Sequence, residues 1–215
     1  MNTNLLKTRN FLILFFILIF NCQIKTDENL EKTIYYTLFN DMIDSTITDY
    51  RSLVVPSMSD FEDLEKKELL QKRKEKKRDS INEPLKITLI NTIEIIPDVN
   101  LFFSQIKKQI SSADYESIVN NKENISKKSY EIITKKISID TSKYDLLNYD
   151  LKNPSIDNSV GKYRLSRIFF NQDKNLGVLK LSIVYGKLNA VGVLVIIRKE
   201  NDKWNIDKII EDWIS

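Results

Sequence analysis

The sequence lacks histidine altogether and contains one cysteine, four glycines and four prolines in 215 residues. Without histidine there can be no histidine-based catalytic triad, no histidine-ligated zinc and no imidazole general base. A single thiol cannot form a disulfide within the chain. The glycines are scattered at positions 161, 177, 186 and 192, so there is no glycine-rich phosphate loop, and no Asp-x-Asp-x-Asp-Gly calcium loop occurs. We therefore predict no catalytic residues of these classes, no cofactor and no metal site.

Carboxylates are the chemistry that remains for an enzyme, because aspartate and glutamate are common in the chain. A carboxylate pair can serve as acid and base, but only its separation in space decides whether it does so. Glu94 lies in an isoleucine-rich run and has two interpretations: a buried acid with a raised pKa, or a surface carboxylate beside an arginine at a strand end. The second arrangement is the commoner one. The other candidate carboxylates are Asp41, Asp44, Asp49, Asp145 and Asp150.

The first 22 residues have the features of a lipoprotein signal peptide. Lys7 and Arg9 supply positive charge ahead of Phe11–Phe20, an uninterrupted apolar run of ten residues. A membrane-spanning helix needs about 20 apolar residues, so this run is too short to span a bilayer and matches the core of a signal peptide. Cys22, the only cysteine, follows directly after Asn21.

Cys22 is predicted to become the lipidated first residue of the mature protein, after removal of the signal peptide at residues 1–21. Thioether attachment requires a thiol just beyond the apolar segment, and a multi-chain lipid anchor holds a protein on a bilayer far more firmly than one acyl chain. The alternatives are a lone thiol after an ordinary signal peptide and an uncleaved anchor. Lipidation predicts a location in the cell envelope, at the outer membrane, with the membrane itself as a partner.

The charge balance gives no argument for binding nucleic acid. The chain has 33 basic and 30 acidic residues, and removal of Lys7 and Arg9 with the signal peptide leaves 31 against 30, a net charge of +1. A basic cluster, Lys72–Arg78, ends a helix predicted to begin at the capping box Ser59–Glu62. The cluster is interpreted either as a patch for acidic lipid headgroups or as a solvated helix end that complements the helix dipole. No aromatic residues interleave with its lysines, so single-stranded nucleic acid is not a predicted partner.

Helical spacing marks the start of the mature chain and a second region near its middle. A helix from about residue 27 to 50 is predicted by apolar residues three to four positions apart: Leu30, Ile34, Leu38, Met42, Ile43 and Ile47. Asp98 is suited to cap a helix carrying Phe102, Phe103, Ile106 and Ile110. Another short helix is indicated by Tyr115, Ile118 and Val119. Residues 130–139 fit a helix or a strand, and residues 140–159 are predicted to form a loop.

Strand spacing dominates the last quarter of the chain. Apolar residues alternate with a period of two over 178–185 and again over 191–197. The second run is apolar at nearly every position, which predicts a central strand covered on both faces. Polar turns separate the strands, so a meander of about four antiparallel strands is predicted from Tyr163 onwards. Another strand is predicted after Pro84, to about residue 96. Trp204 and Trp213 could line a ligand groove, although packing in the core or at its rim is the more common use of tryptophan.

These patterns predict an α+β fold in which N-terminal helices pack on one face of the C-terminal antiparallel sheet. The predicted organisation is a signal peptide over residues 1–21, a tether with N-terminal helices over 22–83, and an α+β domain containing the sheet over 84–215.

The end of the chain also carries a set of motifs: Leu165–Asn171, Asp173–Lys174, Gly186, Gly192, Arg198–Trp204 and Trp213–Ser215. Together with the signal peptide, these motifs resemble uncharacterised lipoproteins of Bacteroidetes-type bacteria. Those proteins carry a Ser-Arg strand opening, an Asn/Asp turn, a glycine-containing hairpin, a Lys-Trp strand start and a terminal Trp-Ile-Ser. Some of them have cysteines beside the central glycines, where this chain has Tyr185 and Ala190, so that bridge is missing here. The resemblance implies a location and an α+β fold, and no activity.

Three functional hypotheses follow from the sequence. The first is a lipid-anchored envelope protein that binds a partner or assists assembly without catalysis, with an envelope protein as its partner. The second is a small-molecule-binding or carboxylate-based hydrolytic domain, which requires a cavity with converging carboxylates or arginines. The third is an immunity-type lipoprotein that blocks a secreted toxin, which the neighbouring genes would decide.

Overall fold

A computed structural model describes residues 27–47, 83–122, 128–149, 159–186 and 189–214. Several sequence predictions lie outside these residues, namely those concerning Cys22, Asp49, the capping box Ser59–Glu62, the basic cluster Lys72–Arg78 and Asp150. In the part of the chain that is described, no helix is both long enough and apolar enough to cross a membrane.

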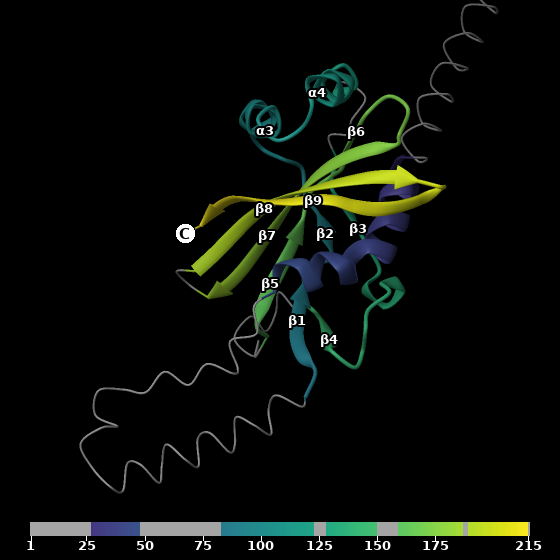
Figure 1. Ribbon diagram of the computed structural model, residues 1–215. Coiled ribbons are helices and arrows are strands. Elements are labelled where there is room, and N and C mark those ends of the chain that lie inside the picture. The colour runs from purple at the N-terminus through teal and green to yellow at the C-terminus, as the bar shows by residue number, and fades with distance from the viewer. Residues whose placement is uncertain (1–26, 48–82, 123–127, 150–158, 187–188, 215) are drawn as a thin grey trace, which may run out of the picture.

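The described strands form one large sheet and one small pair. The large sheet contains β1 (Leu85–Leu89), β4 (Tyr144–Asn148), β5 (Gly161–Leu165), β6 (Phe169–Phe170), β7 (Leu176–Gly186), β8 (Asn189–Glu200) and β9 (Lys203–Ile214). It is seven-stranded, in the order β4–β1–β5–β7–β8–β9 with β6 paired to β7 (Figure 1). β1 runs parallel to both β4 and β5, and the remaining pairs are antiparallel. β2 (Thr92–Ile93) and β3 (Tyr130–Glu131) form a separate antiparallel pair.

The structure confirms the α+β class and corrects the predicted sheet. β5, β7, β8 and β9 are neighbours in an antiparallel arrangement, as the meander prediction required. The prediction of a purely antiparallel sheet of about four strands is wrong, because β1 and β4 extend it through parallel pairing. The prediction of a loop over 140–159 is wrong at β4. That strand lies at the sheet edge and buries only Tyr144, so its sequence lacks the apolar alternation of an inner strand.

Helices cover both faces of the sheet, whereas the sequence prediction placed helices on one face. The helix at residues 27–46 packs with β1, β5, β7 and β8 in one apolar cluster, which includes Phe39, Ile87, Tyr163 and Val195. On the other face, α3 (Val99–Ile106) and α4 (Ser112–Val119) pack in a second cluster with Val178, Leu194 and Ile196 (Figure 1). A short 3₁₀ helix spans Thr134–Lys136. The two layers of helix leave the sheet as the shared wall between two cores.

The two faces of β8 pack in different apolar clusters, which explains why its sequence is apolar at nearly every position. Val193, Val195 and Ile197 belong to the cluster beneath the helix at 27–46, and Leu194 and Ile196 belong to the cluster beneath α3 and α4. The predicted central strand with two covered faces is therefore confirmed.

Candidate ligand-binding site

A row of four residues crosses the sheet on the face that carries α3. Arg164 on β5 pairs with Ser182 on β7, Ser182 pairs with Gly192 on β8, and Gly192 pairs with Trp213 on β9. Neighbouring strands are about 4.8 Å apart, so this row spans about 14 Å from end to end. Arg164, Ser182 and Trp213 line a cleft of about 330 Å³ beside α3. The row forms the floor of this cleft, which we name the α3 cleft.

The indole of Trp213 lies flat on the sheet because the residue opposite it has no side chain. A Cβ atom added to Gly192 would lie 2.0 Å from the indole Nε1 and 2.5 to 2.6 Å from the two ring atoms bonded to it. The flanking atoms are only slightly farther away than Nε1, as expected when the ring covers the glycine with its face rather than its edge. Trp213 is half-buried and lines the α3 cleft.

The opposite wall of the α3 cleft is the segment that leads into α3. Asp98 caps this helix by accepting a hydrogen bond from the Leu101 backbone N–H at 2.9 Å, as the sequence predicted. The cap places Leu101 and Gln105 on the wall of the cleft. Leu101 is 54% exposed and Ile95, at the start of the wall, is 43% exposed. They are among the large apolar side chains that the described surface leaves uncovered.

The charged groups of the α3 cleft balance one another. The Arg164 guanidinium lies 3.8 Å from the Glu94 carboxylate, and both side chains are half-exposed. The Lys180 ammonium donates to the Asp212 carboxylate at 2.6 Å. The lining therefore holds two cations, Arg164 and Lys180, and two carboxylates, Glu94 and Asp98, while Asp212 lies outside the lining and pairs with Lys180. The loose surface pair of Arg164 and Glu94 contributes little to stability. The cleft does not select strongly for a charged ligand.

Three uncharged polar groups line the α3 cleft without a partner in the described structure. They are the amide of Gln105, the hydroxyl of Ser182 and the indole N–H of Trp213, none of which makes a hydrogen bond to a described residue. Together they supply both donors and acceptors at different points around the cleft. A site with an apolar rim and a few unpaired polar groups is the ordinary composition of a small-ligand site.

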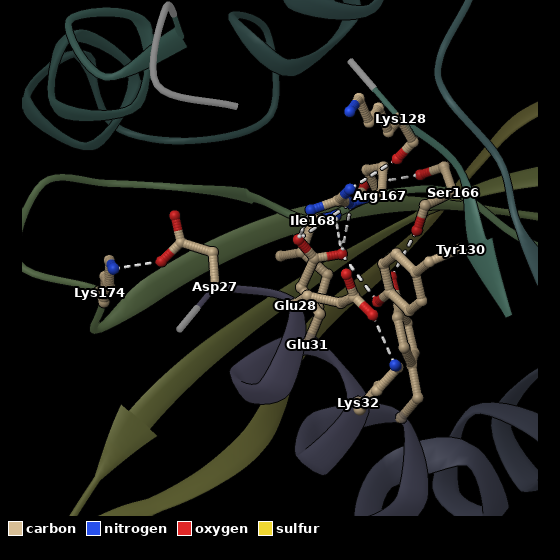
Figure 2. Close-up of polar contacts among 11 residues, drawn as sticks. Asp27, Glu28, Glu31, Lys32, Lys128, Tyr130, Ser166, Arg167, Ile168 and Lys174 are labelled. Carbon is tan, nitrogen blue, oxygen red and sulfur yellow. Dashed lines mark hydrogen bonds and ion pairs between the residues drawn. The ribbon is translucent and has the colours of Figure 1, made fainter. Parts of the chain in front are cut away.

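A second polar cluster is buried between the helix at 27–46 and the sheet, and we name it the Glu31 cluster (Glu31, Tyr35, Tyr130, Ser166 and Arg167). Arg167 binds the Glu31 carboxylate through two nitrogens, with Nε 2.8 Å from Oε2 and Nη2 2.7 Å from Oε1 (Figure 2). The Tyr130 hydroxyl donates to Glu31 Oε2 at 3.0 Å. The Tyr35 hydroxyl donates to the backbone oxygen of Ser166. Glu31 is 1% exposed and Arg167 is 3% exposed.

Burial and the ion pair between Glu31 and Arg167 shift the pKa values in this cluster. Burial raises the pKa of Glu31 above its ordinary value of 4.5, against the opposing effect of Arg167. Burial lowers the pKa of Arg167, but the hydrogen bonds and charge of Glu31 outweigh it and raise that pKa overall. Burial and the neighbouring carboxylate of Glu31 also raise the pKa of Tyr130. Neither Glu31 nor Arg167 lines the α3 cleft, and their polar atoms are satisfied internally. We interpret this cluster as structural.

The structure separates the carboxylates that the sequence offered as candidates. Asp41 lies exposed on the helix at 27–46, while Asp44 accepts a hydrogen bond from the Tyr144 hydroxyl at 2.5 Å. Asp145 lies exposed on β4. Glu94 is a surface carboxylate beside Arg164, which is the second of the two predicted arrangements. Within the described ranges, no three carboxylate or thiol side chains come together in a way that could hold a metal ion.

The two tryptophans of the sequence prediction have different surroundings. Trp204 packs against the Phe170 ring, with 5.6 Å between ring centroids, at the edge of the core beneath the helix at 27–46. Trp213 lines the α3 cleft on the other face. The groove interpretation therefore fits Trp213 and the packing interpretation fits Trp204.

A larger hollow of about 630 Å³ lies along the outer edge of the sheet, between β4 and the segment that carries the 3₁₀ helix. Its lining includes Glu83 and Asn148, which lie at or next to the limits of the described residues. The α3 cleft combines uncovered apolar side chains with three polar groups that have no partner among the described residues, so we take that cleft as the candidate site.

Arg164, Ser182 and Gln105 were not predicted to be cleft residues. The available signal was the strand alternation, because Tyr163 and Leu165 face the core beneath the helix at 27–46 and Arg164 must then face the other way. The register between strands was the part that the sequence did not specify. Comparison of the chain with protein-family models, with curated proteins and with solved structures finds no match.

Proposed function

We propose that this chain is a lipid-anchored protein of the bacterial cell envelope whose folded body binds a ligand without catalysing a reaction. The observation that carries the binding role is the α3 cleft, in which exposed apolar side chains surround unpaired polar groups. The observation that supports the anchor is the position of Cys22 directly behind a short apolar run. Partner binding during assembly and binding of a small molecule are both served by such a cleft.

The distance from the anchor to the fold is short under this proposal. Asp27, where the described helix begins, is five positions after Cys22, and an extended chain spans at most about 3.6 Å per residue. The helix start would therefore lie within about 18 Å of the lipidated residue. That end of the helix carries the ion pair between Asp27 and Lys174. The α3 cleft lies on the opposite face of the sheet, where the anchored helix does not cover it.

Replacement of Cys22 by serine is expected to abolish lipid attachment. The thiol is the atom that forms the thioether, and a hydroxyl does not replace it. Cells expressing the chain are grown with labelled palmitate, and the purified protein is examined for label and by mass spectrometry of its N-terminal peptide. The parent protein should carry label on an acylated Cys22 peptide, and the Cys22→Ser protein should carry none.

The matched control is Asn21→Ser, which changes the preceding residue and keeps the thiol. This variant should remain labelled and membrane-associated. An unacylated N-terminal methionine on the purified parent protein, or label that persists in Cys22→Ser, would contradict the anchor.

A further inference from the structure

The composition of the α3 cleft narrows the class of ligand. This step deepens the proposed binding function and rests on it, because it uses the same cleft. Three properties decide the class: the charge balance, the positions of the unpaired polar groups and the open face of the Trp213 indole. We infer that the α3 cleft binds an uncharged carbohydrate of one or two rings, with one sugar ring stacked on Trp213.

The charge balance argues against an ion as the ligand. Arg164 faces Glu94, and Lys180 is bound to Asp212, whose side chain is almost fully buried. An anionic ligand would gain the attraction of Arg164 but would meet the carboxylate of Glu94 in the same part of the cleft. A cationic ligand would be attracted by the carboxylates of Glu94 and Asp98 but would meet the Arg164 guanidinium beside Glu94. An uncharged ligand with hydroxyl groups can accept from the guanidinium and donate to the carboxylate at once, so it uses both members of the loose pair.

The Trp213 indole supplies a platform for a sugar ring. One face of the ring covers Gly192, and Trp213 lines the cleft, so we take the other face as the one that a ligand would contact. An aromatic face carries partial negative charge, which attracts the partially positive C–H groups on the apolar face of a pyranose. The platform is held rigidly, because the sheet lies beneath the ring and Gly192 leaves it no room to tilt inward.

The polar groups of the cleft lie along the row and on the wall opposite it, where a stacked sugar would present its hydroxyls. Ser182 lies two strands away from Trp213 along the row. Arg164 lies three strands away, about 14 Å from Trp213. Gln105 approaches from α3 on the opposite wall. Amide, carboxylate and guanidinium groups are planar and present paired atoms, which suits the adjacent hydroxyls of a sugar ring. The volume of about 330 Å³ is at the small end of the range for ligand sites, consistent with one or two rings.

The test uses full-length protein in detergent and the emission of its two tryptophans. The probes are neutral disaccharides of glucose, galactose, mannose and N-acetylglucosamine, compared with digalacturonate and with the tripeptide Ala-Leu-Ser. At least one neutral disaccharide is expected to bind and to change the emission. In Trp204→Phe, whose only indole is Trp213, the change should persist in full. In Trp213→Phe, which retains Trp204 on the other face, the emission change should disappear.

Two further variants separate stacking from hydrogen bonding. Trp213→Ala and Gln105→Ala should each weaken binding by tenfold or more in calorimetry, and Gln105→Ala leaves the sheet intact if the tryptophan variant does not fold. Binding of the tripeptide or of digalacturonate without any neutral disaccharide would overturn the ligand class and leave a binding cleft in place. Failure of all probes, or sugar binding that survives both variants, would overturn the inference. The lipid-labelling test of Cys22 is independent of each of these outcomes, because it concerns the anchor and not the cleft.

Discussion

Arg167→Met is expected to lower the free energy of unfolding by about 3–5 kcal/mol, because it leaves the Glu31 carboxylate buried without its main partner. In the parent protein this carboxylate is bound by two guanidinium nitrogens and by the Tyr130 hydroxyl. Methionine fills a similar volume, so the loss reflects the unpaired charge more than a cavity. Urea denaturation followed by circular dichroism measures the change in midpoint and slope.

The double variant Glu31→Leu/Arg167→Met provides the control for this prediction. Removal of both charges leaves no uncompensated ion in the core, and buried ion pairs can often be replaced by apolar residues at little cost. The Tyr130 hydroxyl and the backbone oxygen of Lys128 lose a partner in this variant, so recovery should be incomplete. We expect the double variant to regain at least half of the stability lost in Arg167→Met. A double variant that is less stable than the single variant would show that the ion pair itself stabilises the fold strongly.

The stability deficit of Arg167→Met should depend on pH, and the direction of this dependence follows from the pKa of Glu31. Burial raises the pKa of Glu31 in the folded state, so its folded form holds a proton more tightly than its unfolded form does. The contribution of Glu31 to stability is greatest below about pH 4.5, the ordinary pKa of this side chain. It is lost as the pH rises through the pKa of the folded state. Without Arg167, burial acts with less opposition and the pKa rises further. The deficit of Arg167→Met should therefore shrink between pH 7 and pH 4.5, and a deficit that grows on acidification would contradict this assignment.

Gly192→Ala is expected to displace the Trp213 indole and to lower the free energy of unfolding by about 1–3 kcal/mol, the usual cost of overpacking. The added Cβ would lie 2.0 Å from the indole Nε1, which no pair of non-bonded atoms tolerates. No glycine in the described residues has a positive φ, so alanine meets no backbone strain there and the effect is steric. The emission of Trp213 should shift to longer wavelength as the ring moves into water, and disaccharide binding should weaken with it.

Two comparisons isolate the contact between these residues. Gly161→Ala, on β5, places a Cβ 3.2 Å from the Cγ2 methyl of Ile183 and should have a much smaller effect. In a Trp213→Ala background the obstructing ring is gone, so Gly192→Ala should cost almost nothing. The difference between the two backgrounds is the coupling energy of the pair. Equal costs in both backgrounds would mean that the ring does not lie on Gly192.

Much of the fold could be predicted from local patterns. The helix at 27–46 and the strands β7 and β8 are long and strongly periodic, and the cap at Asp98 has a local chemical signature. Polar turns at residues 172–173 and 201–202 separate β6 from β7 and β8 from β9, in keeping with the predicted polar turns between strands. Asn201 and Asp202, between β8 and β9, both have positive φ, a conformation that asparagine and aspartate tolerate better than most residues.

The parallel part of the sheet could not be predicted because it depends on pairing between distant segments. β1 is joined to β4 and β5 by registers that link residue 85 with 144 and residue 87 with 161. Nothing in five residues of β4 specifies such a register, and an edge strand need not be apolar. The candidate site could not be predicted from the sequence for the same reason. Its floor is a row across four strands, and only the registers between them bring Arg164 and Trp213 into one cleft.

Some of the motif residues at the end of the chain have clear structural roles. Arg167 supplies the buried guanidinium, Gly192 and Trp213 form the cross-strand contact, and Asn171 accepts hydrogen bonds from the backbone of Asn175 and Leu176 at 3.0 and 3.1 Å. Lys174 has a positive φ and reaches Asp27 at the start of the first helix. These roles concern packing and turn geometry. They explain why such residues are needed for the sheet without assigning them an activity.

Under the proposed anchoring at Cys22, the position of Glu31 one turn into the helix at 27–46 has a mechanical consequence. Any tension on the tether would enter the helix at Asp27 and reach the sheet through Lys174 and Arg167 before it reached the apolar contacts farther along. These two ion pairs, close to the point of attachment, would oppose separation of the helix from the sheet. The opposite face, where Trp213 lies on Gly192, would then keep its shape while the anchor is being pulled.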